Sequence, residues 1–250
     1  MTDLAIYDMD RTVTRRATYT PFLLHCAARR APWRLLALPL VVGSMLLYVA
    51  KVIDRGKLKE INHRLLIGRE IHPEVLAPLV ESFAEATLRN NIRPGALAAI
   101  ARDKAEGRRV VMATASYRFY ARAIAERLGF DDTIGTNSIL GLDARVHAKI
   151  DGVNCYGPAK LAMIEAWLAA EGLTRTHVRF YSDHASDAPV FDWSDEPVAV
   201  NPHDRLRRLA KERGWPVVDW GSGPLPSLRG AKRRGNPAQT RNWIASLRSQ

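Results

Sequence analysis

The sequence predicts an α/β fold, a Rossmann-like parallel sheet with helices on both faces and an α-helical cap inserted after the first strand. From residue 94 onward, short apolar segments alternate with segments of helical periodicity, which is typical of βα units in a parallel sheet. A long, mostly helical stretch separates the first apolar segment from this alternation. That stretch therefore reads as an insertion over the ends of the strands.

The elements of the predicted core follow from their residues. The apolar run Leu4–Tyr7 reads as a buried strand, and a proline opens the helix at Pro158, where the first turn of a helix tolerates it. The expected strands are 4–7, 109–113, 132–136, 178–182, 198–201 and 217–219, and the expected helices are 96–106, 117–128, 158–171 and 204–213.

The segment between the first strand and Pro94-Gly95 reads mostly as helix. Leu58, Ile61, Leu65 and Leu66 recur at helical spacing, and a second helical stretch runs over 75–88. We therefore expect a catalytic core over 1–15 and 94–220, a helical cap over 16–93, and a basic C-terminal tail over 221–250.

An apolar run over 35–50 lies inside the predicted cap, and basic residues flank it on both sides. It is shorter than the roughly 20 residues that a spanning helix needs, and Pro39 interrupts it. Three interpretations stay open: contact with an anionic membrane surface, a buried helix pair in the cap, or a short span.

Charge and cysteine content narrow the class of protein. The formal net charge is +11, and six of the positive charges follow Asp219 with no acidic residue among them. No basic segment is interleaved with aromatic side chains, so we expect no specific nucleic-acid partner, although a basic RNA- or membrane-binding module without catalysis is a remote alternative.

Cys26 and Cys155 fit no disulfide framework and no zinc spacing, and the chain opens directly on the first strand, so we expect a cytoplasmic protein.

Two carboxylates, Asp8 and Asp10, end the first strand one residue apart. Two acids this close repel each other unless a cation or a proton-transfer task holds them there. Phosphoryl transfer through an aspartate nucleophile needs such a pair, with one carboxylate to attack and a neighbour to move protons.

Polar residues follow three other strands or open the next helix. Ligands of an open parallel sheet bind beyond the carboxyl ends of its strands, so these residues are expected to share one site. Thr114, Ala115 and Ser116 offer hydroxyl and N–H groups for phosphate oxygens, with Thr114 nearer the strand end than Ser116, and a lysine at 160 can neutralise a phosphate. Carboxylates at 183 and 187 are hard oxygen ligands of the kind that Mg²⁺ prefers. The candidates are Thr114, Ala115, Ser116, Lys160, Asp183 and Asp187.

Four ordered motifs carry a resemblance to a known family. The segments DMDRT, ATAS, the lysine of CYGPAK and SDHASD resemble the four motifs of the haloacid dehalogenase (HAD) superfamily, subfamily IB. The resemblance covers about residues 3–15 and 95–220. It departs from the family at Arg11, where glycine is usual, and at Ser182 and His184.

The resemblance implies a role for each matched residue. Asp8 would attack phosphorus and carry an aspartyl-phosphate, and Asp10 would protonate the leaving oxygen and then activate water. Thr114 and Lys160 would hold the phosphoryl group. Mg²⁺ would bind Asp8, the backbone carbonyl of Asp10, and Asp183, with Asp187 supporting the metal or orienting Lys160.

The resemblance also frames the substrate. Subfamily IB includes phosphoserine phosphatases, with small polar caps, and phosphatidylglycerophosphatase C, which has a hydrophobic segment soon after the first motif. The apolar run of this chain is similar to the latter, and we expect a Mg²⁺-dependent phosphatase of a lipid or amphipathic phosphomonoester, peripheral at the inner face of the membrane. The alternative is a soluble metabolite such as phosphoserine.

Overall fold

The computed structural model describes residues 2–221 and divides the chain into two compact units. Unit 1 holds residues 1–18, 86–136 and 155–227, and unit 2 holds residues 19–85, 137–154 and 228–250. Met1 and residues 222–250 lie outside the described part of the chain. The basic tail expected over 221–250 therefore lies, apart from Gly221, outside the described part of the chain.

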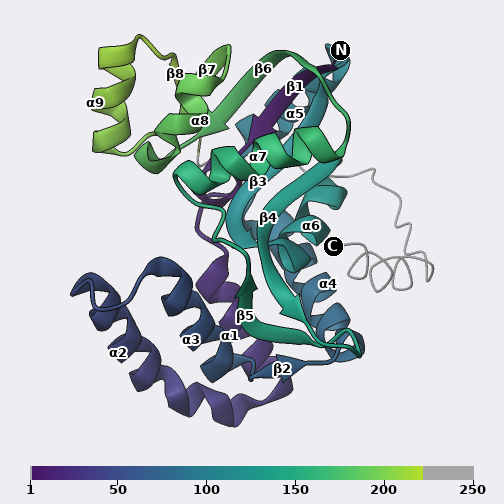
Figure 1. The fold of residues 1–250 in the computed structure, drawn as a ribbon, viewed down its shortest axis with the longest axis vertical. Helices are drawn as coiled ribbons and strands as arrows, with labels where there is room; N and C mark the ends of the chain where they lie inside the picture. The colour runs from purple at the N-terminus through teal and green to yellow at the C-terminus, as the bar shows by residue number, and fades with distance from the viewer. Residues whose placement is uncertain (1, 222–250) are drawn as a thin grey trace. The chain divides into compact units, whose positions relative to one another are not determined.

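Unit 1 is built on a parallel sheet whose strand order is β4-β3-β1-β6-β7-β8 (Figure 1). The first strand lies in the middle of this order, which is the result expected when a right-handed βα chain winds to both sides of its first strand. The strands are β1 (Thr2–Tyr7), β3 (Arg109–Tyr117), β4 (Asp132–Leu140), β6 (Arg175–Ser182), β7 (Glu196–Val200) and β8 (Val217–Val218).

Helices cover both faces of this sheet, as predicted (Figure 1). The alternation of side chains along β1 sends Leu4 and Ile6 to one face, where they join a core that includes Ile164 and Phe191. Tyr7 lies on the other face, where its hydroxyl donates to Asp103. The helices of unit 1 are α5 (Pro94–Ala105), α6 (Arg118–Leu128), α7 (Pro158–Ala170), α8 (Ala188–Trp193) and α9 (Asp204–Arg213), with short turns η1 (Met9–Val13) and η3 (Ala185–Asp187).

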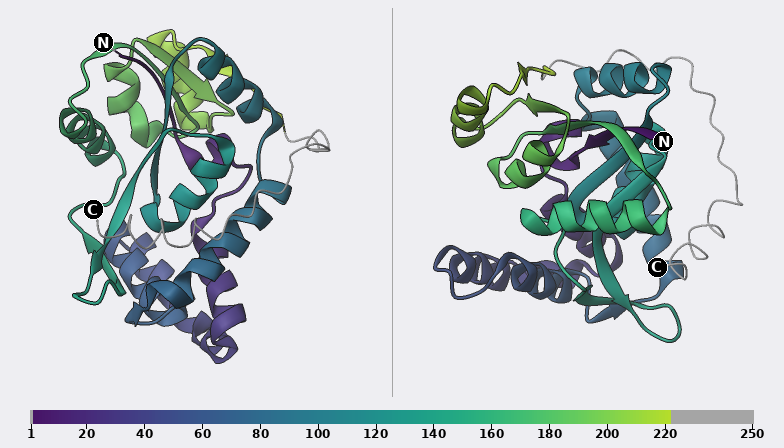
Figure 2. Two further views of the ribbon diagram at one scale, coloured as in Figure 1. Left: turned by 90° about the vertical axis from the view of Figure 1, so that its right-hand side faces the viewer. Right: turned by 45° about the horizontal axis from the view of Figure 1, so that its top comes forward.

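Unit 2 combines helices with a small antiparallel sheet. Helices α1 to α3 run from purple to blue in Figure 2, and the sheet pairs β2 with β5 and β5 with the second half of β4. The elements are α1 (Tyr19–Arg30), η2 (Pro32–Ala37), α2 (Leu38–Val49), α3 (Arg55–Leu66), β2 (Glu70–Ile71), α4 (Pro73–Asn90), which continues into unit 1, and β5 (Val146–Asp151).

The sequence missed this antiparallel sheet. The strand expected over 132–136 continues to Leu140, and the chain then turns back into β5. Residues 137–154 therefore belong to unit 2, whereas the sequence placed them in the core. Residues 146–151, VHAKID, do alternate apolar and polar side chains, as expected for a strand with one covered face, so a local signal for β5 was present in the sequence and was overlooked.

Three smaller boundaries also differ from the predictions. Tyr117 ends β3 instead of opening the next helix, and Asn201 lies beyond β7 with a positive φ of 44°. Pro39 does not break the apolar run, because it lies in the first turn of α2, where its missing N–H would have no helical partner.

The apolar run is exposed to solvent in the structure. Val41 and Ser44 are the buried residues of α2, whereas Leu40 and Leu46 are 63% and 64% exposed. Residues Pro32–Val49 are long and apolar enough to cross a membrane by length and composition, and 11% of this stretch is buried in the fold. The interpretation as a buried helix pair is therefore wrong for the described chain.

Candidate active site

Lys160 joins two of the predicted carboxylates at the carboxyl ends of the central strands. Its Nζ lies 2.8 Å from Oδ1 of Asp8, which follows β1, and 2.7 Å from Oδ2 of Asp187, which follows β6. The lysine is 2% exposed although it lies in the first turn of a helix, so it is not the solvated residue that a lone lysine at that place would suggest.

Asp183 enters the same cluster through Thr12. The Thr12 hydroxyl lies 3.3 Å from Oδ2 of Asp8 and 3.3 Å from Oδ1 of Asp183, and it accepts a hydrogen bond of 3.0 Å from the Asp183 N–H. The two carboxylates therefore present oxygens to either side of one buried hydroxyl. Thr12 was not predicted, and its place inside the first motif was the only signal for it.

Burial sets the electrostatics of this cluster. Loss of solvation raises the pKa of Asp8 to about 8 and that of Asp183 to about 6, and the neighbouring Asp187 adds to both shifts. Burial alone would lower the pKa of Lys160, but the attraction of Asp187 and Asp8 outweighs it, so this pKa lies above its usual value. Three buried carboxylates thus face one buried ammonium.

This excess of negative charge suits a hard divalent cation. No group of three or more His, Cys, Asp or Glu side chains within residues 2–221 is arranged to hold a metal ion. Magnesium, however, commonly binds through one or two carboxylates and completes its shell with water and substrate phosphate. Asp8 and Asp183 meet that requirement. The Oδ1 atom of Asp187 is buried without a hydrogen-bond partner among the described residues, which adds to the unmet negative charge.

The Asp10 carboxylate accepts hydrogen bonds from hydroxyl and backbone N–H donors and forms no ion pair with Lys160 among the described contacts. Its Oδ1 accepts from the N–H and the hydroxyl of Thr18, at 2.7 and 2.8 Å, and its Oδ2 accepts from the Ser116 hydroxyl at 2.7 Å. Three donors fix the direction of this carboxylate, as a proton-transfer group requires. The sequence ranked Ser116 below Thr114, and it did not identify Thr18.

The second motif ends β3 beside this site. Thr114 is fully buried, and its hydroxyl accepts from the Ser116 N–H at 3.1 Å, while the carbonyl of Ala115 accepts from the Thr136 hydroxyl at 2.8 Å. These bonds lie in the last residues of β3, where the register with β4 shifts between Thr114 and Tyr117. Neither of these two hydrogen bonds involves Asp8 or Lys160.

The departures from the family pattern have structural partners. Ser182 donates to Oδ2 of Asp187 at 2.7 Å, and the ring of His184 accepts from the Ser186 N–H. Arg11 has a left-handed backbone with φ of 66°, the conformation that glycine adopts without strain, and its guanidinium lies 3.1 Å from His203. His203, which the sequence did not single out, lies 3.3 Å from Asp183.

A parallel sheet with carboxylates and a buried lysine beyond the carboxyl ends of its strands defines an α/β protein with a charged ligand site at that edge. The chain belongs to the haloacid dehalogenase-like hydrolase family, whose model matches residues 5–192.

Three similar proteins show how far the similarity in sequence and structure extends. A Streptomyces azureus protein named for inhibition of morphological differentiation is 36% identical over 46% of this chain, and a histidinol-phosphatase of Neisseria meningitidis is 29% identical over 59%. The matched regions span 41% and 68% of those relatives. A solved Bordetella pertussis protein of unknown function superposes with a TM-score of 0.80 at 26% identity, covering 88% of this chain and all of that one.

Proposed function

We propose that this chain is a phosphatase that hydrolyses phosphate monoesters through Asp8. The observation that carries the proposal is the buried contact of Lys160 with Asp8, 2.8 Å long, at the carboxyl edge of a parallel sheet. An ammonium beside a carboxylate nucleophile reduces its repulsion of an anionic phosphate. Membership of a hydrolase family supports the same reaction class.

The residues take the following parts in this reaction. Asp8 attacks phosphorus as the bond to the leaving oxygen breaks, which leaves the phosphoryl group on its carboxylate. Asp10, aligned by Thr18 and Ser116, gives a proton to the leaving oxygen and then takes one from the water that releases phosphate. Lys160 attracts the phosphoryl oxygens.

The supporting residues hold the phosphate and the lysine. The Thr114 hydroxyl and the Ala115 N–H bind phosphoryl oxygens at the end of β3. Asp187, fixed by Ser182, orients Lys160 through their 2.7 Å contact.

We also propose that Mg²⁺ serves this site, held by Asp8, Asp183 and the backbone carbonyl of Asp10. When bound, the ion neutralises charge on the carboxylates and on the phosphoryl oxygens. This fits a carboxylate nucleophile whose pKa burial raises to about 8, because a nearby cation favours its charged form.

Phosphate release from p-nitrophenyl phosphate, with Mg²⁺ or with EDTA, tests the reaction. We expect Asp8→Asn to lose at least about a thousandfold in kcat, because the amide cannot form the intermediate. Asp204→Asn, which alters an exposed carboxylate at the start of α9, serves as the matched control and keeps its activity. Activity that survives in Asp8→Asn, or that EDTA does not reduce, would contradict the proposal.

For the substrate we propose a lipid or amphipathic phosphomonoester. The exposed stretch Pro32–Val49, which contains η2 and α2, is the supporting observation, because a mean hydropathy of 1.6 with 11% of the stretch buried is unusual beside solvent. Arg29, Arg30 and Arg34 precede it and Lys51 and Arg55 follow it. Cationic ends around an apolar helix suit the headgroups of an anionic bilayer, so we place the protein at the inner face of the membrane.

Flotation with vesicles tests this placement. We expect the chain to float with vesicles containing phosphatidylglycerol and the double variant Leu40→Glu/Leu46→Glu to stay in the dense fraction. Both leucines are already exposed, so the change does not enter the core. The control Leu142→Glu/Val153→Glu alters two exposed apolar residues outside α2 and keeps its binding. Equal flotation of both variants would remove the membrane contact.

A soluble phosphorylated metabolite is the second candidate, and the histidinol-phosphatase relative favours it. A screen with Mg²⁺ over phosphatidylglycerophosphate, phosphatidate, phosphoserine and histidinol phosphate separates the two. A larger kcat/KM for either soluble compound than for both lipids would overturn the lipid preference and leave the phosphatase reaction in place.

A further inference from the structure

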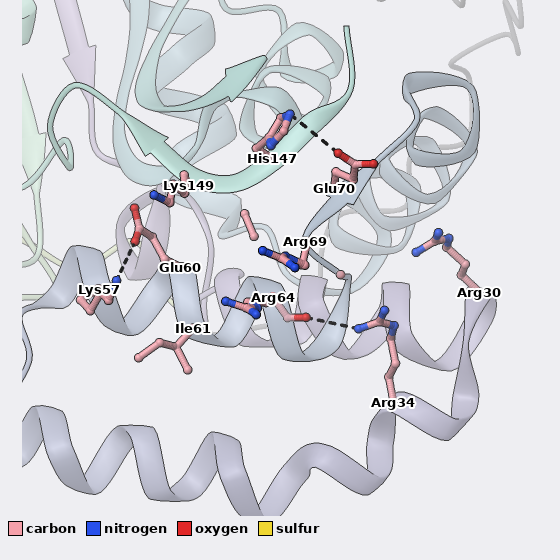
Figure 3. Close-up of a pocket in the computed structure, with 12 residues that line it drawn as sticks. Arg30, Arg34, Lys57, Glu60, Ile61, Arg64, Arg69, Glu70, His147 and Lys149 are labelled. Carbon is pink, nitrogen blue, oxygen red and sulfur yellow. Dashed lines mark hydrogen bonds and ion pairs between the residues drawn. The ribbon is translucent and has the colours of Figure 1, made fainter. Parts of the chain in front are cut away.

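A basic hollow lies within unit 2, and none of its lining residues belongs to the candidate active site. It has a volume of about 680 Å³ and opens between α1, η2, α3 and the strands β2 and β5 (Figure 3). This volume is in the range of small-molecule sites in proteins. Six cationic and two acidic side chains line it: Arg30, Arg34, Lys57, Arg64, Arg69 and Lys149, with Glu60 and Glu70.

The two acidic side chains already have partners. Glu70 forms an ion pair with Arg145, and Glu60 lies 3.5 Å from Lys57 and accepts from the Ile150 N–H at 3.1 Å. Their charge is therefore compensated before the remaining cations of the hollow are considered.

Two of the arginines cap the end of α3. Arg34 donates to the carbonyl of Leu65 at 3.0 Å, and Arg30 donates to the carbonyl of Ile67 at 2.8 Å. Carbonyls at the end of a helix carry partial negative charge and would repel an anion. These two guanidinium groups offset that charge and hold one wall of the hollow.

Three cations remain without compensation. Within the described part of the chain, no hydrogen bond or ion pair involves the side chains of Arg64, Arg69 or Lys149. Figure 3 shows Arg64 and Arg69 in the middle of the hollow and Lys149 at its edge. All three side chains are exposed to solvent, and positive charges gathered in a concave surface create a local potential that attracts anions.

We propose that this hollow binds a phosphate-bearing ligand through Arg64, Arg69 and Lys149. Guanidinium groups match the oxygens of phosphate with paired hydrogen bonds, and a lysine adds a further charge. The same chemistry fits a free phosphorylated metabolite and the headgroup of an anionic lipid. The site needs neither Asp8 nor turnover, so it stands apart from the phosphatase reaction.

The experiment measures binding of two probes to the full chain in EDTA. The soluble probe is glycerophosphoglycerol, a phosphodiester, and its binding is measured by calorimetry. The membrane probe is a vesicle of phosphatidylglycerol and phosphatidylcholine, and its binding is measured by sedimentation and compared with binding to vesicles of pure phosphatidylcholine. The variant is Arg64→Gln/Arg69→Gln. Its control, Arg205→Gln/Arg208→Gln, removes the same charge from exposed positions on α9.

We expect binding of at least one probe to weaken about tenfold or more in the hollow variant and to be unchanged in the control, because charge-assisted hydrogen bonds are lost only in the former. Loss confined to glycerophosphoglycerol identifies a soluble ligand, and loss confined to the anionic vesicles identifies a lipid headgroup. Binding of neither probe by the wild-type chain, or equal binding by the variant and its control, overturns the proposal. Circular dichroism melting of both variants confirms that each is folded.

Discussion

Lys160 shows how a single side chain fixes the charge of the candidate active site. Its ammonium lies between Asp8 and Asp187 in a space closed to solvent, where the two carboxylates would otherwise repel each other. Truncating one partner of a buried ion cluster is costly, because the charges left behind have neither water nor a counter-ion.

We expect Lys160→Met to lower the free energy of unfolding by about 3–5 kcal/mol at pH 7.5 in EDTA. The loss should shrink at pH 5.5. The pKa of Asp8 is raised to about 8 in the fold, so between pH 4 and 8 this carboxyl group binds more protons in the folded state than in the unfolded state, and its contribution to stability grows on acidification. In Lys160→Met we expect the free energy of unfolding to rise more on acidification than in the wild-type chain, because no ammonium favours the charged form of Asp8.

Urea unfolding at both pH values measures the effect. Lys211→Met, an exposed lysine on α9, is the control and should change the free energy of unfolding by less than about 0.5 kcal/mol. Equal stability of the two variants at pH 7.5 would contradict the role given to Lys160.

A second titrating residue, His63 on α3, predicts acid sensitivity. It is fully buried, and burial lowers its pKa to about 3. Below about pH 6.5 this imidazole therefore binds more protons in the unfolded state, and its contribution to stability falls as the pH drops from there toward 3.

We expect about 2–3 kcal/mol of unfolding free energy to be lost between pH 7 and 4.5 through this residue. His63→Gln, which cannot titrate, should flatten that fall in urea unfolding curves. His72→Gln, at a histidine whose side chain is 45% exposed, should leave it unchanged. An identical pH dependence in His63→Gln and the wild-type chain would count against this reading.

At the level of elements, α2 is a helix whose stability does not come from burial. Two of its residues are buried, and Ser44 donates to Asn62 of α3 at 2.7 Å. Propensity therefore matters more here than in a buried helix, because few tertiary contacts override it. Gly43 in its middle is the weakest position, since a glycine gains the most backbone freedom on unfolding.

We expect Gly43→Ala to raise the free energy of unfolding by about 0.5–1 kcal/mol, because an added Cβ meets no atom within 4 Å. Gly172→Ala is its matched counterpart. Its Cβ would also meet nothing, but φ is 61°, so alanine is strained there and about 1 kcal/mol is lost. Thermal unfolding of both variants measures the difference, and a loss of stability in Gly43→Ala would contradict the helical account.

At the scale of the whole molecule, distant parts of unit 1 close on one another around β1. The ring of Tyr7 stacks on that of Tyr181 at 4.4 Å, and the ring of Trp220, near the end of the described chain, lies 6.1 Å away. Gly95 donates its N–H to the carbonyl of Trp220 at 3.2 Å. The segment that contains Trp220, the closing segment of the described chain, thus packs directly on the backbone at the start of α5.

We expect Gly95→Ala to lower the free energy of unfolding by about 1–3 kcal/mol, because the new Cβ would lie 2.7 Å from the Cα atom of Trp220. Gly43→Ala is the control for adding a methyl group without a clash. Urea unfolding checks the result. A Gly95→Ala protein as stable as the wild type would contradict the expected clash, because the closing segment would then move to make room for the methyl group.

The sequence by itself determined the class of fold and the family, since both follow from local signals. The alternation of apolar strands and helices was visible along the chain, and the candidate polar residues stood near the ends of the expected strands or opened a helix. In a parallel sheet those positions share one edge, so convergence of Asp8, Lys160, Asp183 and Asp187 followed from topology. Their catalytic roles stay predictions.

The tertiary structure alone decided what surrounds those residues. Thr12, Thr18 and Ser182 orient the carboxylates, yet hydroxyl side chains of this kind are common in turns and carry no distinctive pattern. The pairing of β2 with β5 joins segments more than 70 residues apart, and the basic hollow is lined by residues between Arg30 and Lys149. Such pairings are set by which surfaces meet in space, and local periodicity does not record them.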